Sequence, residues 1–289
     1  MRAVVIGTGA VAAFLGVALE ERGFLPAFFG RRGPTAFTAR VTRAGGDTQL
    51  VCCRAPSPDE VAAAQIAFVA VKAFDLEAAL AWTTALAPGT AVIPVVNGLV
   101  EDIVRAAAHA APQLPFRLGF STVGVSALDE LGCYAVRAKS GEIAFGALDG
   151  AAPPNAAERK LLDGQGVFAW HAQILAAAHR KWLYNVVINT LCAARALKSN
   201  GDLLGDIPML AAVFNEAWTL GGERFGGFGV EKAEAYKAME RLIDATAANE
   251  NSMARDKRLG RRTETPFLAG LAQDAKRFPL LMELARRAL

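Results

Sequence analysis

The N-terminal stretch RAVVIGTGAVAAFLGVALEE constrains the fold more than any other part of this 289-residue chain. Residues 3–6 are apolar and rich in β-branched side chains, as in a buried strand, and residues 10–21 have the composition of a helix. Gly7 and Gly9 stand between them, where the strand must turn sharply into the helix. The segment therefore predicts a strand, a tight turn and a helix in direct succession.

The turn has the spacing of the G-x-G-x-x-G fingerprint, with a permitted alanine, Ala12, at the third position. Gly7 allows the tight turn, Gly9 lets a pyrophosphate approach the backbone, and Ala10 opens a helix whose N-terminus attracts phosphate. A lone match of this kind can be merely a tight turn, but here it follows a strand and opens a helix. We therefore expect Gly7, Gly9, Ala10 and Ala12 to bind a dinucleotide.

The chain divides into a strand-rich part and a helical part. Up to about residue 172, short apolar runs first alternate with helical segments and then follow one another closely. This predicts a Rossmann-type α/β domain over residues 1–172, with a mainly parallel sheet and an antiparallel extension. The pattern then becomes almost entirely helical, which predicts an all-α domain over residues 173–289. The further expected strands are 25–30, 65–72, 90–98, 117–128, 133–139, 141–148 and 167–173, and the further expected helices include 75–87, 156–165, 209–226 and 231–250.

The end of the second expected strand indicates which dinucleotide binds. Enzymes for NAD usually place an acidic side chain about 20 residues past the glycines, whereas this chain has no acid there and carries Arg31 and Arg32. Guanidinium groups match a 2′-phosphate, so the sequence favours NADPH. Two arginines in a solvated turn would leave the missing acid unexplained. Lys72, at the end of the expected strand 65–72, lies on the same edge and is expected to add a second cation.

Composition excludes several other classes of protein. The net charge of +3 is too small to indicate nucleic-acid binding, and the four cysteines and three histidines show no metal-ligand spacing. No apolar run is long enough to span a membrane, and the strand-like N-terminus does not resemble a signal peptide. We expect a cytoplasmic protein with neither a metal, nor a nucleic-acid partner, nor a membrane segment.

Three polar residues recur every four positions in the apolar segment HRKWLYNVVINTLCA, residues 179–193. Four residues of an α-helix turn about 400°, so Lys181, Asn185 and Asn189 form one polar stripe. Taken alone, such a stripe is more typical of an exposed seam on an amphipathic helix. An ammonium and two amides amid so much apolar surface would otherwise need partners, which favours a binding cleft.

Three further polar residues are candidates. Asn97 follows an expected strand at the sheet edge where ligands collect, although it can equally be a turn asparagine before glycine. Ser252 lies at the end of the expected helix 231–250, and Glu264 precedes Thr265, an expected helix cap. The basic residues between Arg255 and Arg262 fit a solvated face better than an RNA-binding patch, because no aromatic side chains interleave with them.

Four blocks together resemble the ketopantoate reductase (2-dehydropantoate 2-reductase) family over nearly the whole chain. They are GTGAVA, then VKAF with VVNGL, then KWLYNVVINTLCA followed by SNGDL, and finally NSMARDKRLGRRTE. The resemblance implies a Rossmann-type domain followed by a helical domain like the C-terminal domain of 6-phosphogluconate dehydrogenase. It also implies reduction of 2-dehydropantoate to (R)-pantoate in pantothenate and coenzyme A biosynthesis, with NADPH as the cofactor.

The resemblance also implies roles for residues that match the family's motifs. Lys181 matches the general acid, Glu264 an active-site glutamate, and Asn97 an asparagine near the nicotinamide. Asn185, Asn189 and Ser252 match substrate-binding residues. Arg31 and Lys72 match positions that hold the NADPH phosphate. A protonated lysine suits this role, because hydride addition to a 2-oxo acid builds negative charge on the carbonyl oxygen.

Three positions depart from the family's pattern, and two other functions stay open. Asp75 and Val96 stand where glutamines are expected, and Gly30 precedes the arginines. Asp75 is expected to weaken NADPH binding through repulsion. The alternative functions are reduction of another 2-oxo acid, or of an imine as in opine-type dehydrogenases, and a non-catalytic NADP(H) sensor. The joint presence of Lys181 and Glu264 argues against a sensor. A homodimer is expected by analogy alone.

Overall fold

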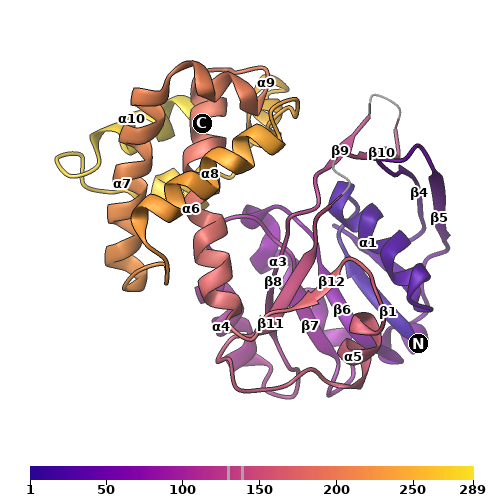
Figure 1. Cartoon of the computed structure of the whole chain (residues 1–289). Coiled ribbons are helices and arrows are strands. Elements are labelled where there is room, and N and C mark those ends of the chain that lie inside the picture. Colours follow the sequence, from indigo (N-terminus) through magenta and orange to yellow (C-terminus); the bar gives the residue numbers. More distant parts are fainter. Residues whose placement is uncertain (129–130, 138–139) are drawn as a thin grey trace. The chain divides into compact units, whose positions relative to one another are not determined.

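The chain folds into two compact units, Met1–Leu175 and Ala176–Leu289 (Figure 1). The computed structural model describes residues 1–128, 131–137 and 140–289. Residues 138–139 of the expected strand 133–139 lie outside the described residues. The first unit contains all the named strands, and the second is built from helices, so the α/β and helical fold classes expected from the sequence are both confirmed.

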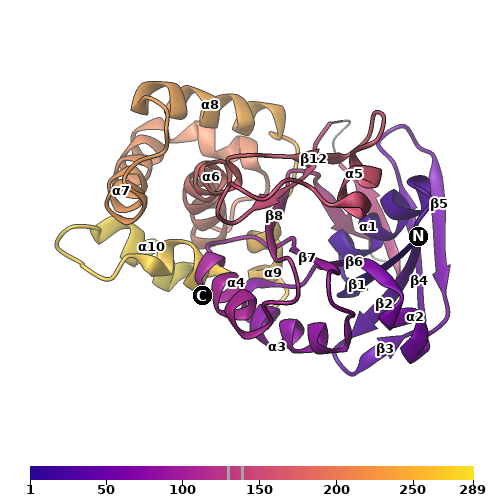
Figure 2. The same cartoon turned by 90° about the horizontal axis from the view of Figure 1, so that it is seen from below.

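A five-stranded sheet forms the centre of the first unit. Its order is β3-β2-β1-β6-β7, and all pairs are parallel except β2 with β3. Helix α1 lies on one face of this sheet together with α5, and α3 lies on the other (Figure 2). The strands are β1 (Arg2–Ile6), β2 (Leu25–Gly30), β3 (Gly33–Thr35), β6 (Ala64–Val69) and β7 (Ala91–Pro94), and the helices are α1 (Ala10–Glu21), α3 (Leu76–Leu80) and α5 (Ala156–Leu162).

A second sheet, which the sequence analysis did not anticipate in this form, packs on the outer side of α1. Its order is β5-β4-β10-β9, with β9 (Val125–Ala127), β10 (Cys133–Val136), β4 (Phe37–Thr42) and β5 (Thr48–Cys53). Helix α1 contacts both sheets, which explains why every residue from Ala12 to Leu19 is buried. On β10, the Tyr134 hydroxyl donates to the carbonyl of Thr8 at 3.2 Å and so ties this sheet to the glycine turn.

A third sheet continues from β7. Its order is β12-β11-β8, where β8 (Arg117–Ser121) pairs antiparallel with β11 (Ile143–Ala147) and β12 (Phe168–Trp170) pairs parallel with β11. Isolated parallel bridges join Val92 to Phe116 and Val95 to Gly119. The expected extension is therefore mixed rather than purely antiparallel.

The expected helix 75–87 is broken into three short pieces. These are a 3₁₀ turn at Ala73–Asp75, helix α3, and a 3₁₀ turn at Ala81–Ala85. The Thr83 hydroxyl donates to the carbonyl of Leu80, and the Thr84 hydroxyl donates to the carbonyl of Ala81. Such bonds to carbonyls three residues back compete with regular helical bonding, which accounts for the break.

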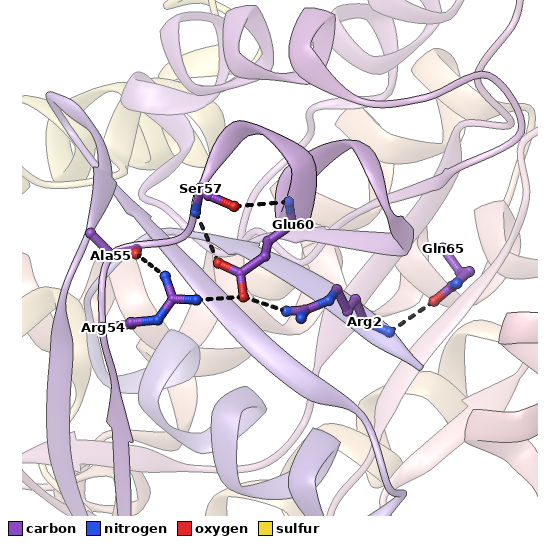
Figure 3. Close-up of polar contacts among 6 residues, drawn as sticks. All are labelled: Arg2, Arg54, Ala55, Ser57, Glu60 and Gln65. Carbon is purple, nitrogen blue, oxygen red and sulfur yellow. Dashed lines mark hydrogen bonds and ion pairs between the residues drawn. The ribbon is translucent and has the colours of Figure 1, made fainter.

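A polar cluster lies at the end of the five-stranded sheet where β1 begins (Figure 3). Ser57 caps the short helix α2 (Pro58–Ala62) in a reciprocal capping box, in which the Ser57 N–H donates to Glu60 at 2.9 Å. Glu60 also pairs with Arg54 at 2.8 Å and with Arg2 at 2.9 Å. The Ser57 N–H and these arginines lower the pKa of Glu60. The cluster therefore joins α2 to the first strand.

One buried ion pair fixes α5 to the third sheet. Arg117 on β8 donates to both carboxylate oxygens of Glu158 on α5, at 2.6 and 2.8 Å, and both side chains are at most 5% exposed. Glu158 also accepts from the N–H of Asn155, and the Arg117 guanidinium lies 5.2 Å from the ring centroid of Trp170. Each charge thus has a close partner, as buried ions require.

The second unit packs around α6, whose range is Ile174–Ala194. Its Trp182 lies edge-on against Phe225 and is buried. A Cβ at Gly221 would lie 2.2 Å from Phe228 and 3.0 Å from Trp182, so only glycine permits this packing. Among the described residues, no helix combines the length and apolarity needed to cross a membrane. The other helices are α7 (Ile207–Phe225), α8 (Lys232–Ala245), α9 (Ser252–Arg258) and α10 (Pro279–Ala288), with 3₁₀ turns at Asn200–Gly205, Thr265–Phe267 and Ala269–Leu271.

Candidate functional site

The candidate cofactor residues of the first unit all follow parallel strands at one edge of the central sheet. Gly7 follows β1, Arg31 follows β2, Lys72 lies three residues past β6, and Asn97 lies three residues past β7. The carboxyl ends of parallel strands share one edge, which is where ligands bind in doubly wound folds. The topology therefore brings these four residues to the same edge of the sheet.

The structure gives a different reason for glycine at each of the two positions in the turn, Gly7 and Gly9. Gly7 has φ +134°, and a Cβ there would lie 2.1 Å from the carbonyl oxygen of Ala70, so any side chain would clash. A Cβ at Gly9 would meet no atom within 4 Å. Gly9 is also the N-cap of α1, to which it brings no side-chain acceptor for the first-turn N–H groups. The open space beside it is what close approach of a phosphate requires. Ala10 is the first residue of α1, and Ala12 is buried beneath it.

Arg31 lies beside Asp75, one of the three positions that depart from the family's pattern. Arg31 Nη2 is 3.5 Å from Asp75 Oδ2, and the side chains are 89% and 40% exposed. The sequence suggested that Asp75 would repel a phosphate, and the structure adds that it pairs with the arginine expected to bind one. Val96 is buried, so an apolar side chain at that position has a packing reason.

The polar stripe on α6 changes in burial along its length. Lys181 and Asn185 are partly buried, and Asn189 is 7% exposed. Burial lowers the pKa of Lys181 to about 8 from an ordinary value of 10.5, and the negative charge of Glu264 opposes this shift. A lysine with a pKa of about 8 is mostly protonated at neutral pH, and it releases its proton more readily than an ordinary lysine.

Glu264 is held by its two threonine neighbours. It is buried, and it occupies the N-cap position of the turn Thr265–Phe267 rather than the position before the cap. The Thr263 hydroxyl donates to the carbonyl of Ala288 at 3.1 Å, and the Thr263 and Thr265 hydroxyls are 2.8 Å apart. These anchors fix the backbone on both sides of the carboxylate that acts on Lys181.

Ser252 does not lie at the end of a helix as expected. Helix α8 already ends at Ala245, and Ser252 is the exposed first residue of α9. The reason is Asn251, whose side chain accepts from the N–H groups of Met253 and Ala254 and so starts a new helix. Asn251 also donates to Asn189 at 2.8 Å. Sequence reasoning missed Asn251, although an asparagine just before a helical stretch is a cap signal.

The second unit therefore brings its site residues into two groups. Lys181 and Glu264 form one, and Asn189, Asn251 and Ser252 form the other, with Asn185 midway along the same face of α6. Among the described residues, no cluster of three or more histidines, cysteines or acids is placed to bind a metal ion.

A parallel sheet with a glycine turn at its carboxyl edge, followed by a helical unit that carries a lysine of lowered pKa, defines a class of two-unit oxidoreductases. Family comparison agrees. The model described as ketopantoate reductase PanE/ApbA matches residues 3–150, and the model of its C-terminal part matches residues 173–276. The chain belongs to the ketopantoate reductase family, which confirms the resemblance found in the sequence.

Solved structures of low sequence identity share the fold over the full chain. A 2-dehydropantoate 2-reductase from Geobacter metallireducens is 18% identical with a TM-score of 0.79, and 100% of each chain is covered. A D-mandelate dehydrogenase with NADH and anilino(oxo)acetate is 19% identical with a TM-score of 0.80, covering 100% of this chain and 97% of that one. A dimeric ketopantoate reductase from Staphylococcus aureus is 17% identical with a TM-score of 0.71, covering 100% and 96%. No curated protein sequence matches the chain significantly.

Proposed function

We propose that this protein reduces 2-dehydropantoate to (R)-pantoate with NADPH, as a step in pantothenate and coenzyme A biosynthesis. The observation that carries the proposal is the partly buried Lys181 of α6, whose pKa is about 8 beside Glu264, in a chain of the ketopantoate reductase family. Reduction of a carbonyl needs a proton donor of this kind, because negative charge develops on the oxygen.

The first unit fits the cofactor. NADPH supplies the hydride when bound. Gly9 and Ala10 offer the backbone N–H groups of an α-helix of twelve residues, and the space beside Gly9 is open. Arg31 and Lys72 bring two cations to the same sheet edge, where they would hold the 2′-phosphate. Asn97 would orient the reacting end of the cofactor.

The second unit supplies the acid and the substrate contacts. Lys181 would donate its proton to the carbonyl oxygen, and Glu264 would keep that lysine protonated by raising its pKa. Asn185 and Asn189 would bind the polar substrate without adding charge, and Ser252 would bind its carboxylate. We accordingly assign cofactor binding to residues 1–172 and substrate binding and proton transfer to residues 173–289, in a cytoplasmic enzyme.

A second candidate substrate has its own support. The structure that gives a TM-score of 0.80 is a D-mandelate dehydrogenase, and mandelate, like pantoate, is a 2-hydroxy acid. That dehydrogenase binds NADH, whereas Arg31 in this chain favours NADPH. The alternative is thus reduction of a different 2-oxo acid, or of an imine as in opine-type enzymes. A non-catalytic NADP(H) sensor is the third candidate function.

A homodimer is also part of the proposal, because the ketopantoate reductase from S. aureus is dimeric.

The test is loss of NADPH absorbance with the wild-type protein and Lys181→Ala, using 2-dehydropantoate and then a panel of 2-oxo acids with and without an amine. We expect turnover with 2-dehydropantoate, a loss of at least about a hundredfold in the variant, and nearly unchanged NADPH binding. Wild-type turnover in Lys181→Ala would refute the general-acid role. Turnover only with another acid would select the alternative substrate, and tight NADPH binding without turnover would favour the sensor.

A further inference from the structure

A relay of side-chain amides lies behind the substrate-facing stripe of the second unit. We infer that Asn251 is a positioning residue that fixes the amide of Asn189 so that its N–H group, and not its carbonyl, is offered to the substrate. This inference rests on the proposed function of Asn189, and the argument comes from the hydrogen bonds around Asn251, which is 6% exposed.

The first anchor of the relay is the start of α9. Asn251 Oδ1 accepts from the backbone N–H groups of Met253 at 3.0 Å and Ala254 at 3.3 Å. A backbone N–H can only donate, so the atom that faces both must be the oxygen of Asn251. The orientation of this amide is therefore set by chemistry that does not depend on telling nitrogen from oxygen. Its Nδ2 group is left to point the other way.

The second anchor is Thr246, the C-cap residue of α8. The Thr246 hydroxyl donates to the carbonyl of Leu242 at 2.7 Å, which uses its single proton. Thr246 must then accept from Asn200 Nδ2, at 3.0 Å, which leaves the oxygen of Asn200 facing Asn251 at 3.4 Å. This route starts from a backbone acceptor and reaches the same conclusion, that Asn251 presents its nitrogen.

The two protons of Asn251 Nδ2 thus have two acceptors. One is Asn200 Oδ1, and the other is Asn189 Oδ1 at 2.8 Å. Because its oxygen is turned toward Asn251, the Nδ2 group of Asn189 points the other way and is the end offered to a bound molecule. An N–H donor recognises a hydroxyl, carbonyl or carboxylate oxygen, all of which a 2-oxo acid carries. The same Asn251 caps the helix that begins with Ser252, so one side chain places both groups.

Asn251→Asp separates these roles. The carboxylate still caps α9 and suits the helix N-terminus, but it cannot donate. Asn189 then gains hydrogen bonding only by turning its own nitrogen toward residue 251, which presents an oxygen to the substrate. We expect KM for the 2-oxo acid to rise about tenfold, with kcat largely kept and the Kd for NADPH unchanged. Asn155→Asp, at the N-cap of α5, is the matched control and should leave KM unchanged.

Two further variants show whether Asn251 acts through Asn189. In an Asn189→Ala background, Asn251→Asp should raise KM no further. Asn189→Asp, which offers only oxygens without touching the cap, should reproduce the rise in KM and keeps the inference testable if Asn251→Asp does not fold. An effect of Asn251→Asp that is the same with and without Asn189, or a KM within about twofold of wild type, overturns the inference.

A readout independent of catalysis is hydrogen exchange of the ¹⁵N-labelled asparagine side chains. In the wild type, the amide protons of Asn251 should exchange slowly and those of Asn189 faster. In Asn251→Asp, the Asn189 protons should become protected. The reverse pattern overturns the inference even if the protein reduces no 2-oxo acid, and the expected pattern supports it in that case, so its fate is separate from that of the proposed function.

Discussion

The pair of Lys181 and Glu264 should set how the rate of reduction depends on pH. The acid must be protonated, so kcat/KM for reduction should be level below a pH of about 8 and fall about tenfold per unit above it. Glu264 raises the pKa of Lys181, so Glu264→Gln should move this fall to lower pH. Initial rates between about pH 6 and about pH 10 measure both profiles. Identical profiles for the two proteins would mean that the carboxylate does not act on the lysine.

Asp75 forms an exposed ion pair with Arg31 and so competes with a 2′-phosphate for the same guanidinium. Because exposed pairs contribute at most about 1 kcal/mol, Asp75→Asn should raise the preference for NADPH over NADH by up to about fivefold. Arg31→Ala should weaken the binding of NADPH far more than the binding of NADH. Cofactor fluorescence gives the Kd values for both cofactors and so tests both variants. Glu77→Gln, an exposed acid two residues away, is the control and should not change the ratio.

At the scale of elements, α5 depends on the buried pair of Arg117 and Glu158. Glu158→Gln leaves the Arg117 guanidinium buried without a counter-charge, which should lower the free energy of unfolding by about 3 kcal/mol or more. Urea denaturation measures the loss. Asp163→Asn removes an exposed partner of Lys160 and should change stability by less than about 0.5 kcal/mol. Equal losses in both variants would show that burial gives this pair no special weight.

The elements also show where sequence reasoning reached its limit. The β1, α1 and β2 segments were predictable because the apolar pattern of each segment fits only one kind of element, a strand or a helix. Strands β3, β4 and β5 were not assigned, although β4 alternates buried apolar and exposed polar residues, as a half-buried strand does. A second missed signal was α1 itself: a helix that is apolar all round must be covered on both faces. Asn251 was missed because its role depends on Asn189, which is 62 residues away.

At the scale of the whole molecule, the proposed division of labour predicts a pattern of amide protection. NADPH alone should slow hydrogen exchange at the glycine turn and after β2 and β6, because it binds the native first unit. Addition of the 2-oxo acid should then slow exchange in α6 and at the start of α9. Mass spectrometry of proteolytic fragments measures both steps. Protection by the acid that is confined to the first unit and leaves α6 and α9 unchanged would contradict this division of labour.

The contrast between Gly7 and Gly9 has a consequence for how this protein can change in the laboratory. At Gly7, the Ala70 carbonyl leaves no room for any side chain, whereas at Gly9 the chain itself imposes no such limit. A library of variants sorted for soluble yield should therefore reject every replacement at Gly7 and accept alanine at Gly9. The same library sorted for cofactor capture should reject both. That outcome would show that Gly7 is needed for a foldable chain and Gly9 for the ligand.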